Sequence, residues 1–444
     1  MQLLEEMTYP NQSEDCLSLN IWTKPQSGEA KKAVLVWIHG GAYTSGGSNS
    51  VWYNGQAFVE KEDVIVVSLN YRLSIFGFPG NPTTRANLGL LDQRLAVEWV
   101  RDNIAAFGGD TDRIALFGQS AGGGSSDFYS YAWTDDPIVH GFILMSGTVG
   151  LGTLSNETAN SLWFNSTTAV GCGGASDDHD KVHECMMTKS GAEISAKLPA
   201  NTDKDLPLLF SPTVDEQVVF SNYSGRKPIA APVLVGNTDF EAGLYRLLAP
   251  QLPESALPDL NSVTFVCPAA QRAADSVLQG NPTWRYRYFG DFPNLELTTD
   301  PPSGAWHGSD VPVLFNATPT EIMPDTPEEQ AVGAYLRGAW AAFAKDPVNG
   351  LSTYGDGGWP RYSTNESTLV RLAYHNRVGP NLGIGNEYDF NCTGIPMVIS
   401  PANGSTPTTS SGAPVPTTTS NSSGRVGPAM GLVLGVFAVL GIFL

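Results

Sequence analysis

The sequence has little positive charge. Its 444 residues include 25 Lys and Arg against 44 Asp and Glu, which gives a formal net charge of −19. This balance argues against nucleic-acid binding, because such binding depends on basic side chains that neutralise phosphates. The acidic residues are spread along the chain and form no tail, so we interpret them as a source of solubility.

The start of the chain does not resemble a signal peptide. Residues 1–7 contain two glutamates where a basic segment and an apolar run are expected. Sequons of the form Asn-x-Ser/Thr nevertheless favour the secretory route and a glycosylated extracellular protein. They begin at Asn11, Asn156, Asn165, Asn222, Asn316, Asn365, Asn391, Asn403 and Asn421. Cysteine is scarce, and its odd count of 5 leaves at least one residue without a partner in this chain.

Two segments of unusual composition end the sequence. Residues 401–425 are rich in Ser, Thr, Pro and Gly, and residues 426–444 are almost wholly apolar. This order is typical of a glycosylphosphatidylinositol (GPI) attachment signal, with the attachment residue in 411–413 or 421–424. The alternative is a retained membrane span, since the tail is just long enough to cross a bilayer. No basic cluster follows the tail, which favours GPI attachment; either anchor predicts a membrane contact outside the cytosol.

A serine follows a short apolar segment near the middle of the first half. Residues 114–117 predict a buried strand, and Gly118–Gly122 then fits the pattern G-x-S-x-G around Ser120. Small residues two before and two after the serine permit a sharp strand-to-helix turn that exposes its Oγ. A lone G-x-S-x-G is common by chance, and an ordinary Gly/Ser turn is the alternative. The preceding strand and the partners found elsewhere favour Ser120 as a nucleophile.

Strands and helices alternate around this serine. Apolar patterns predict strands at 14–22, 32–38, 63–72, 141–146 and 231–236. Residues 87–104 predict a helix, with helical spacing of Leu91, Leu95, Trp99 and Val100. Short connections between strand, helix and strand indicate an α/β fold with a mostly parallel sheet.

Glycines also follow the predicted strand 32–38 directly, in His39-Gly40-Gly41. Glycine lets backbone N–H groups approach a ligand closely. In a serine-hydrolase geometry the N–H groups of Gly40, Gly41 and Ala121 would form the oxyanion hole. A plain glycine turn is the alternative, and the proximity of a G-x-S-x-G pattern in the same chain weakens it.

These motifs together resemble the type-B carboxylesterase/lipase family, which also contains cholinesterases and fungal extracellular lipases. The matching segments, in the family's order, are Glu14–Asn20, His39–Gly41, Asn87–Arg94, Phe107–Asp110 and Phe117–Gly122. The resemblance implies an α/β-hydrolase fold with helices on both faces of the sheet and a helical cap region. We therefore expect a hydrolase domain at 1–395, a Ser/Thr/Pro-rich linker at 396–425 and the apolar tail at 426–444.

A serine nucleophile needs a base, and the base needs an acid that orients it. In this fold the order along the chain is serine, acid, histidine. The resemblance places the histidine at His307, where His-Gly precedes an acidic residue, and the acid at Glu241, which precedes a small residue and Gly. Asp239 is the alternative acid, with turn capping as its other possible role. His375 lacks the family context and is interpreted as a surface or packing residue.

The spacing of His179 and His183, with Cys172 and Cys185 on either side, would suit a zinc site. An oxidised secreted protein is expected to join the two cysteines instead, and the resemblance implies that disulfide. We therefore expect no metal site there.

Three cysteines remain. Cys267 and Cys392 are candidates for a second bridge. The family pairs the cysteine equivalent to Cys16 with one further upstream, and no such cysteine precedes it here. The resemblance therefore implies an N-terminally truncated chain that lacks the family's first strands and signal peptide.

The resemblance implies hydrolysis of a carboxylic ester without a metal or organic cofactor. Choline esters lose support, because no Trp stands just upstream of Glu14 and because Gln119 occupies the position where cholinesterases carry Glu. A small uncharged ester or a lipid ester is the expected substrate. Two alternatives remain: a non-catalytic cell-surface adhesion protein of the same family, and an inactive truncated fragment. The oligomeric state is not determined by the sequence.

Overall fold

The computed structural model describes residues 12–25, 31–198, 210–321, 323–389 and 391–392. Residues 1–7, the whole linker at 396–425 and the apolar tail at 426–444 lie outside these residues, so the predictions made for them are not tested. In the part of the chain that is described, no helix combines the length and the apolar character needed to span a membrane.

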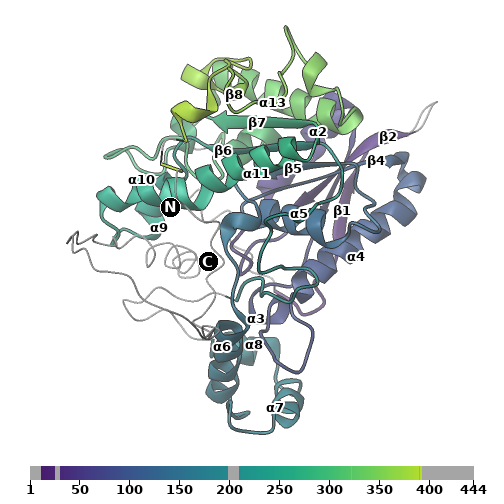
Figure 1. Cartoon of the computed structure of the whole chain (residues 1–444), viewed down its shortest axis with the longest axis vertical. Helices are drawn as coiled ribbons and strands as arrows, with labels where there is room; N and C mark the ends of the chain where they lie inside the picture. The colour runs from purple at the N-terminus through teal and green to yellow at the C-terminus, as the bar shows by residue number, and fades with distance from the viewer. Residues whose placement is uncertain (1–11, 26–30, 199–209, 322, 390, 393–444) are drawn as a thin grey trace, which may run out of the picture.

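A single eight-stranded sheet forms the centre of the molecule, in the order β1-β3-β2-β4-β5-β6-β7-β8 (Figure 1). Only the edge strand β1 is antiparallel to its neighbour; the other pairs are parallel. The strands are β1 (Leu19–Trp22), β2 (Lys32–Ile38), β3 (Ile65–Leu69), β4 (Gly109–Gln119), β5 (Gly141–Met145), β6 (Val233–Thr238), β7 (Thr283–Tyr288) and β8 (Leu369–Leu372). The chain thus has the mostly parallel α/β architecture that the sequence predicts.

Alternating residues of each central strand enter two separate cores. In β2, Leu35 and Trp37 pack in one core, whereas Val34 and Val36 pack in the other. This follows from the two-residue period of a strand, which points neighbouring side chains to opposite faces. Both faces are covered, and this explains why the central strands are apolar throughout.

Helices cover the two faces of the sheet. One core includes side chains of α4 (Leu88–Asn103), α5 (Ala121–Ala132) and α11 (Cys267–Leu278). The other includes side chains of α2 (Gln56–Glu62), α12 (Asp310–Phe315) and α13 (Pro327–Lys345). A buried ion pair of 2.7 Å between Asp127 and Arg272 joins α5 to α11 on the first face.

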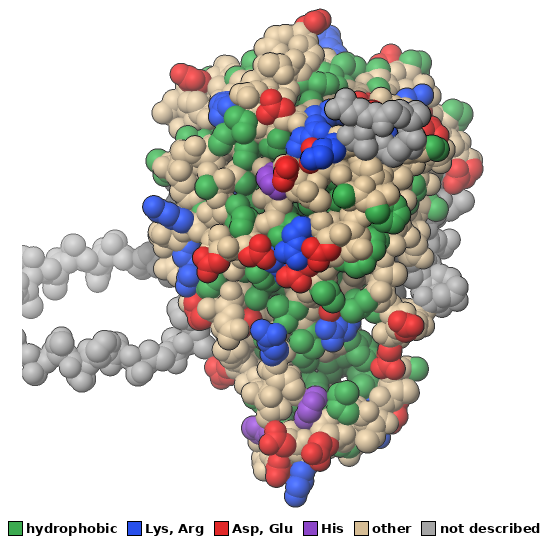
Figure 2. Space-filling view, turned by 90° about the vertical axis from the view of Figure 1, so that its right-hand side faces the viewer, with side chains coloured by type: hydrophobic (Ala, Val, Ile, Leu, Met, Phe, Trp, Pro, Cys, Tyr) green, Lys and Arg blue, Asp and Glu red, His purple; other side chains and the backbone are tan. Residues whose placement is uncertain are grey.

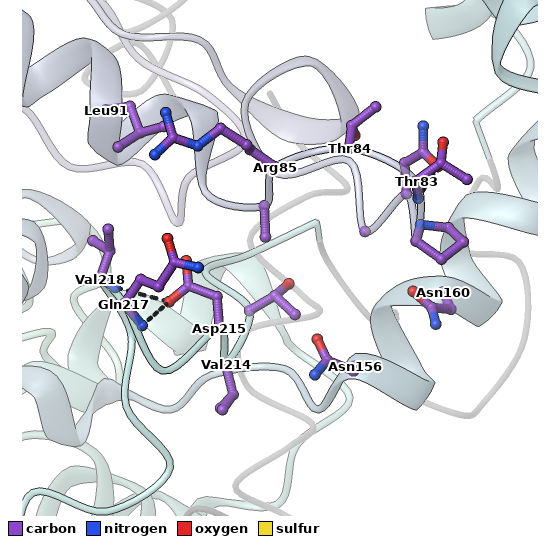
Figure 3. A pocket seen from close by; sticks show the side chains of 15 residues that line it. Thr83, Thr84, Arg85, Leu91, Asn156, Asn160, Val214, Asp215, Gln217 and Val218 are labelled. Atoms are coloured by element: carbon purple, nitrogen blue, oxygen red, sulfur yellow. Dashed lines mark hydrogen bonds between the residues drawn. The ribbon is translucent and has the colours of Figure 1, made fainter. Parts of the chain in front are cut away.

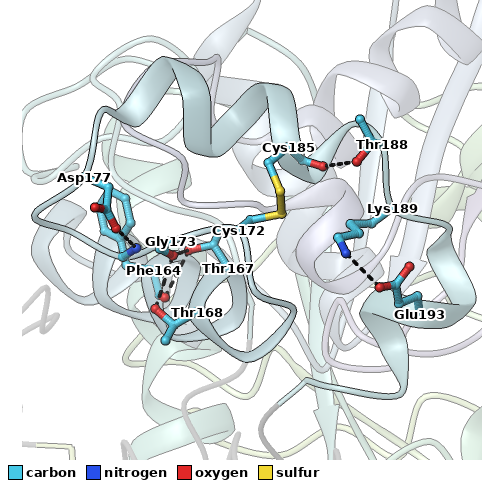
Figure 4. The surroundings of a disulfide bond; sticks show 11 residues. Phe164, Thr167, Thr168, Cys172, Gly173, Asp177, Cys185, Thr188, Lys189 and Glu193 are labelled. Atoms are coloured by element: carbon cyan, nitrogen blue, oxygen red, sulfur yellow. Dashed lines mark hydrogen bonds and ion pairs between the residues drawn. A yellow bond between two sulfur atoms is a disulfide. The ribbon is translucent and has the colours of Figure 1, made fainter.

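The remaining helices lie near the carboxyl ends of the strands or in a projecting lobe (Figure 1). They are α3 (Ser74–Gly77), α6 (Asn156–Ala169), α7 (His179–Met186), α8 (Gly191–Ser195), α9 (Tyr245–Leu248) and α10 (Leu257–Asn261). In the lobe of α6 to α8, the structure joins Cys172 to Cys185 with an S–S distance of 1.94 Å (Figure 4). A second disulfide links Cys267 to Cys392, and Cys16 is free among the described cysteines.

The expected helix at 87–104 forms, and of the residues predicted for its buried face Val100 is buried and Leu91 is half-buried, but Leu95 and Trp99 are exposed. Leu95 is 60% exposed and Trp99 is 38% exposed, whereas Leu90, Val97 and Val100 are buried. The buried residues follow a spacing close to 3.6 residues, which matches the helical repeat better than the predicted set. Trp99 instead packs against the half-exposed Phe107 at the end of the helix, with ring centroids 6.3 Å apart.

Charged side chains are mixed on the surface. On the face shown in Figure 2, Lys and Arg side chains lie among acidic ones and do not merge into one basic area. This distribution agrees with the interpretation of the negative charge as a general property of the surface.

Candidate active site

Ser120 lies on the sharp turn between β4 and α5. Its backbone angles are φ 57° and ψ −124°, a strained combination for a residue with a side chain. Two glycines make the turn possible. A Cβ on Gly122 would stand 2.0 Å from the carbonyl oxygen of Ile38, and a Cβ on Gly118 would stand 2.4 Å from the carbonyl carbon of Gly122. The G-x-S-x-G spacing is therefore required by close backbone contacts.

His307 and Glu241 meet beyond the carboxyl ends of the strands. The Nδ1 atom of His307 lies 2.5 Å from Oε2 of Glu241. The Glu241 side chain is fully buried and that of His307 is 5% exposed. The backbone N–H of His307 also donates to the carbonyl oxygen of Glu241 at 3.2 Å. A carboxylate in this position selects the tautomer that carries its proton on Nδ1 and leaves Nε2 unprotonated, as a hydrogen-bond acceptor.

The second oxygen of Glu241 is held from two sides. Oε1 accepts hydrogen bonds from the hydroxyl of Ser146 and from the backbone N–H of Thr238, each at 2.7 Å. These bonds compensate for the burial of a charged group. The sequence reasoning missed Ser146. The available signal was its position, since a polar residue directly after a buried parallel strand faces the edge where sites form in α/β sheets.

Asp239, the alternative acid, points elsewhere. Its carboxylate accepts from Nε of Arg287 at 2.7 Å, and its backbone oxygen accepts from the same guanidinium at 2.8 Å. Its side chain is 39% exposed. Two residues of the same loop therefore have different partners, and only Glu241 contacts His307. His375 is exposed, as expected for a surface residue.

Gln119 connects the turn of Ser120 with the histidine. Its Nε2 lies 3.2 Å from Nε2 of His307. On its other side, a Cβ placed on Gly40 would come within 3.0 Å of both the Gln119 side-chain oxygen and Cβ of Ser120. The Gln119 side chain therefore contacts the Gly40 turn on one side and His307 on the other. The closeness of the amide to His307 was not foreseen from the sequence.

The three residues expected to form an oxyanion hole lie on the two turns that follow β2 and β4. Gly40 follows β2 and lies against Ser120, and Gly41 has φ 111°, a conformation that side chains rarely adopt. Ala121 is the first residue of α5, so its N–H belongs to the helix terminus and has no intrahelical acceptor. Partial positive charge at such a terminus suits a developing oxyanion.

His39 supports this turn as a buried neutral group. Its ring stacks on Tyr71 with centroids 4.5 Å apart, and its Nδ1 lies 2.8 Å from the carbonyl oxygen of Gly40. Burial lowers the pKa of His39 to about 4. The ring is therefore uncharged at neutral pH, and its Nδ1 carries the proton that the Gly40 carbonyl accepts.

Asp310 is a second carboxyl group near the histidine. It begins α12, three residues after His307, and is only 2% exposed. Burial, together with the negative charge of Glu241, raises the pKa of Asp310 to about 7. The sequence showed an acidic residue at this position, but its burial depends on the tertiary structure.

The cysteines considered for zinc are joined to each other. His179 faces the carbonyl oxygen of Ala175 at 3.1 Å, and His183 faces the amide of Asn81 at 3.1 Å. Within the described ranges, no group of three His, Cys, Asp or Glu side chains is arranged to hold a metal ion.

Comparison with known proteins gives a consistent result. The carboxylesterase family model matches residues 1–256 and 252–390. "Secreted lipase 5" of Gibberella zeae is 35% identical over 407 residues, covering 83% of this chain and 75% of the relative. "Chlorogenic acid esterase" of Aspergillus niger is 36% identical over 374 residues, covering 82% and 72%. "Acetylcholinesterase" of Bungarus fasciatus is 27% identical, covering 83% and 70%. With its α/β sheet and the turn at Ser120, the chain therefore belongs to the carboxylesterase family.

Proposed function

We propose that the chain is a serine hydrolase that cleaves carboxylic esters, with Ser120 as nucleophile, His307 as base and Glu241 as the orienting acid. The observation that carries this proposal is the buried contact of 2.5 Å between Glu241 and His307, beside the turn that presents Ser120. The relatives named as a lipase and as an esterase support the same reaction class.

The proposed reaction proceeds through an acyl-enzyme. His307 Nε2 accepts the proton of Ser120 as Oγ forms a bond to the ester carbonyl carbon. The N–H groups of Gly40, Gly41 and Ala121 stabilise the oxyanion. The intermediate expels the alcohol, which takes the proton from His307. Water then attacks the acyl group, with His307 again as base, and releases the acid and free Ser120.

The proposed substrate is an uncharged small-molecule ester or a lipid ester. The neutral amide of Gln119 beside His307 supports this choice, because it offers no negative charge to a cationic alcohol group. The names of two relatives point to lipids and to an ester of a phenolic acid as starting points for a substrate screen.

Hydrolysis of p-nitrophenyl esters from acetate to palmitate, by the purified chain and by Ser120→Ala, tests the proposal. We expect activity that the substitution abolishes, with a chain-length optimum that separates esterase from lipase. Absence of activity in a chain that melts cooperatively would overturn the proposal in favour of a non-catalytic adhesion protein. Absence of both activity and a cooperative transition would support the inactive fragment.

We also propose an extracellular location. The two disulfides and the relative named as a secreted lipase support it. Attachment of a GPI anchor to a residue in 411–413 or 421–424, with removal of the apolar tail at 426–444, is proposed from composition alone. Release from cell membranes by a phosphatidylinositol-specific phospholipase is the expected result; retention would favour a membrane span.

A further inference from the structure

A cavity between two loops and α6 has a lining that includes none of the candidate active-site residues. Its volume is about 630 Å³. Figure 3 shows Thr83, Thr84 and Arg85 on one loop, Asp215 and Gln217 on the facing loop, and Asn156 and Asn160 on the helix. The lining contains no aromatic residue. Hydroxyl, amide, guanidinium and carboxylate groups share the lining with the apolar side chains of Leu91, Val214 and Val218, a mixture that suits a sugar with both hydroxyl groups and C–H faces.

One of the lining residues is the acceptor asparagine of a sequon. Asn156, in Asn156-Glu157-Thr158, is exposed and is the first residue of α6. Across the cavity, Arg85 is exposed and forms no ion pair with any described residue. A sugar attached to Asn156 would therefore start at the wall of a cavity that already offers donors and acceptors.

A second cavity shows the same relationship. Its volume is about 500 Å³, and Asn222, Gln271, Asp275 and Gln279 contribute to its lining. Asn222 belongs to the sequon Asn222-Tyr223-Ser224 and is exposed. Leu278, which also lines this cavity, is 84% exposed, so an apolar side chain stands uncovered beside the acceptor asparagine.

We propose that Asn156 and Asn222 carry N-linked glycans whose first sugars occupy these two cavities. The proposal rests on the extracellular route proposed above. In the modification, the Asn Nδ2 loses a proton and bonds to C1 of N-acetylglucosamine, as the bond from C1 to the phosphate of a lipid pyrophosphate donor breaks. Because the sugar is tethered at the cavity wall, its effective concentration there is high and a weak contact suffices.

The chain contains a matched control. Asn365, in Asn365-Glu366-Ser367, is exposed but lines neither cavity. Its glycan would extend into solvent. Thr158→Ala, Ser224→Ala and Ser367→Ala each remove one sequon and keep its asparagine, whereas Thr158→Ser and Ser224→Thr keep the sequon.

The test uses the chain secreted from a glycosylating host, with site occupancy measured by glycopeptide mass spectrometry. On the folded protein, we expect a peptide N-glycosidase to release the glycans of Asn156 and Asn222 about tenfold more slowly than that of Asn365. After denaturation the three rates should be equal. Thr158→Ala should speed amide hydrogen exchange at 80–86 and 213–218, whereas Thr158→Ser and Ser367→Ala should not.

Two results would overturn the inference: unmodified Asn156 and Asn222 in a chain that is glycosylated at Asn365, or equal release rates from the folded protein. Ester hydrolysis measured on the same samples reports separately on Ser120. If the glycan prediction fails while hydrolysis is retained, only this proposal is rejected. If hydrolysis is absent while the glycan prediction holds, only the proposed function is rejected.

Discussion

Glu241 uses different carboxylate oxygens for His307 and for Ser146. Oε2 lies 2.5 Å from Nδ1 of the histidine, and Oε1 accepts the serine hydroxyl at 2.7 Å. The rotamer of the acid is therefore set from the side opposite the histidine. A carboxylate held in this way orients the imidazole without having to be reordered during a reaction.

Glu241→Gln tests the role of the acid. The amide would place a donor or a weaker acceptor against Nδ1, so the favoured tautomer of His307 would be lost. We expect kcat to fall by about 10³- to 10⁴-fold, as for an equivalent change in a serine protease triad. Asp239→Asn is the matched control, because Asp239 contacts Arg287 and not the histidine. Equal losses in the two variants, measured with p-nitrophenyl butyrate, would reject the assignment of Glu241.

Gln119→Glu would add a negative charge beside His307. A carboxylate near the present position of the amide, 3.2 Å from His307 Nε2, favours the protonated imidazolium. Since the proposed base must be neutral, the acid limb of kcat/KM against pH should move upward by about one unit. Gln119→Met has a similar length and no charge, and its acid limb should stay in place. An unmoved limb in Gln119→Glu would contradict the prediction.

Asp310→Asn should change how stability depends on pH. The pKa of Asp310 rises from 3.8 in its unperturbed state to about 7 in the folded protein. Between these values the native state binds a proton that the unfolded state lacks, so the wild-type free energy of unfolding falls as pH rises from about 4 to about 7. At pH 8, ionisation of the buried Asp310 lowers the free energy of unfolding of the wild type by at most about 4 kcal/mol.

Urea unfolding at pH 4.5 and pH 8 measures this effect. The asparagine variant carries no ionisable group at position 310, so its stability relative to wild type should be higher at pH 8 than at pH 4.5. Titrations of other residues, including His39, cancel in this comparison. The same difference at both pH values would show that Asp310 titrates normally.

The two disulfides should contribute unequally to stability. Cys267 and Cys392 are separated by 125 positions, whereas Cys172 and Cys185 are separated by 13. In the chain-entropy model, the longer loop restricts the unfolded chain more, and its loss should cost about 5 kcal/mol against about 3 kcal/mol for the shorter one. Unfolding of the two double Cys→Ser variants in urea tests this order, and a larger loss for Cys172/Cys185 would refute it.

The sequence predicted β2 but missed β7, and the composition of the two strands explains the difference. The strand predicted at 32–38 forms over that same range, because an uninterrupted apolar run can only be buried on both faces. β7 reads Thr-Trp-Arg-Tyr-Arg-Tyr and was not predicted, since arginines seldom occupy a buried strand. Arg285 and Arg287 are accommodated there by ion pairs with Asp389 and Asp239. These partners are distant in sequence, so no local pattern reveals them.

The sequence by itself determined the turn at Ser120 and the glycine turn after β2, because tight backbone contacts in both require glycine at fixed spacings. Only the tertiary structure decided which of the two acids on one loop reaches the histidine 66 positions away. The same holds for the support from Ser146 and for the burial of Asp310. Hydrogen bonding and desolvation act between groups that folding brings together, so they depend on distance in space and not on spacing along the chain.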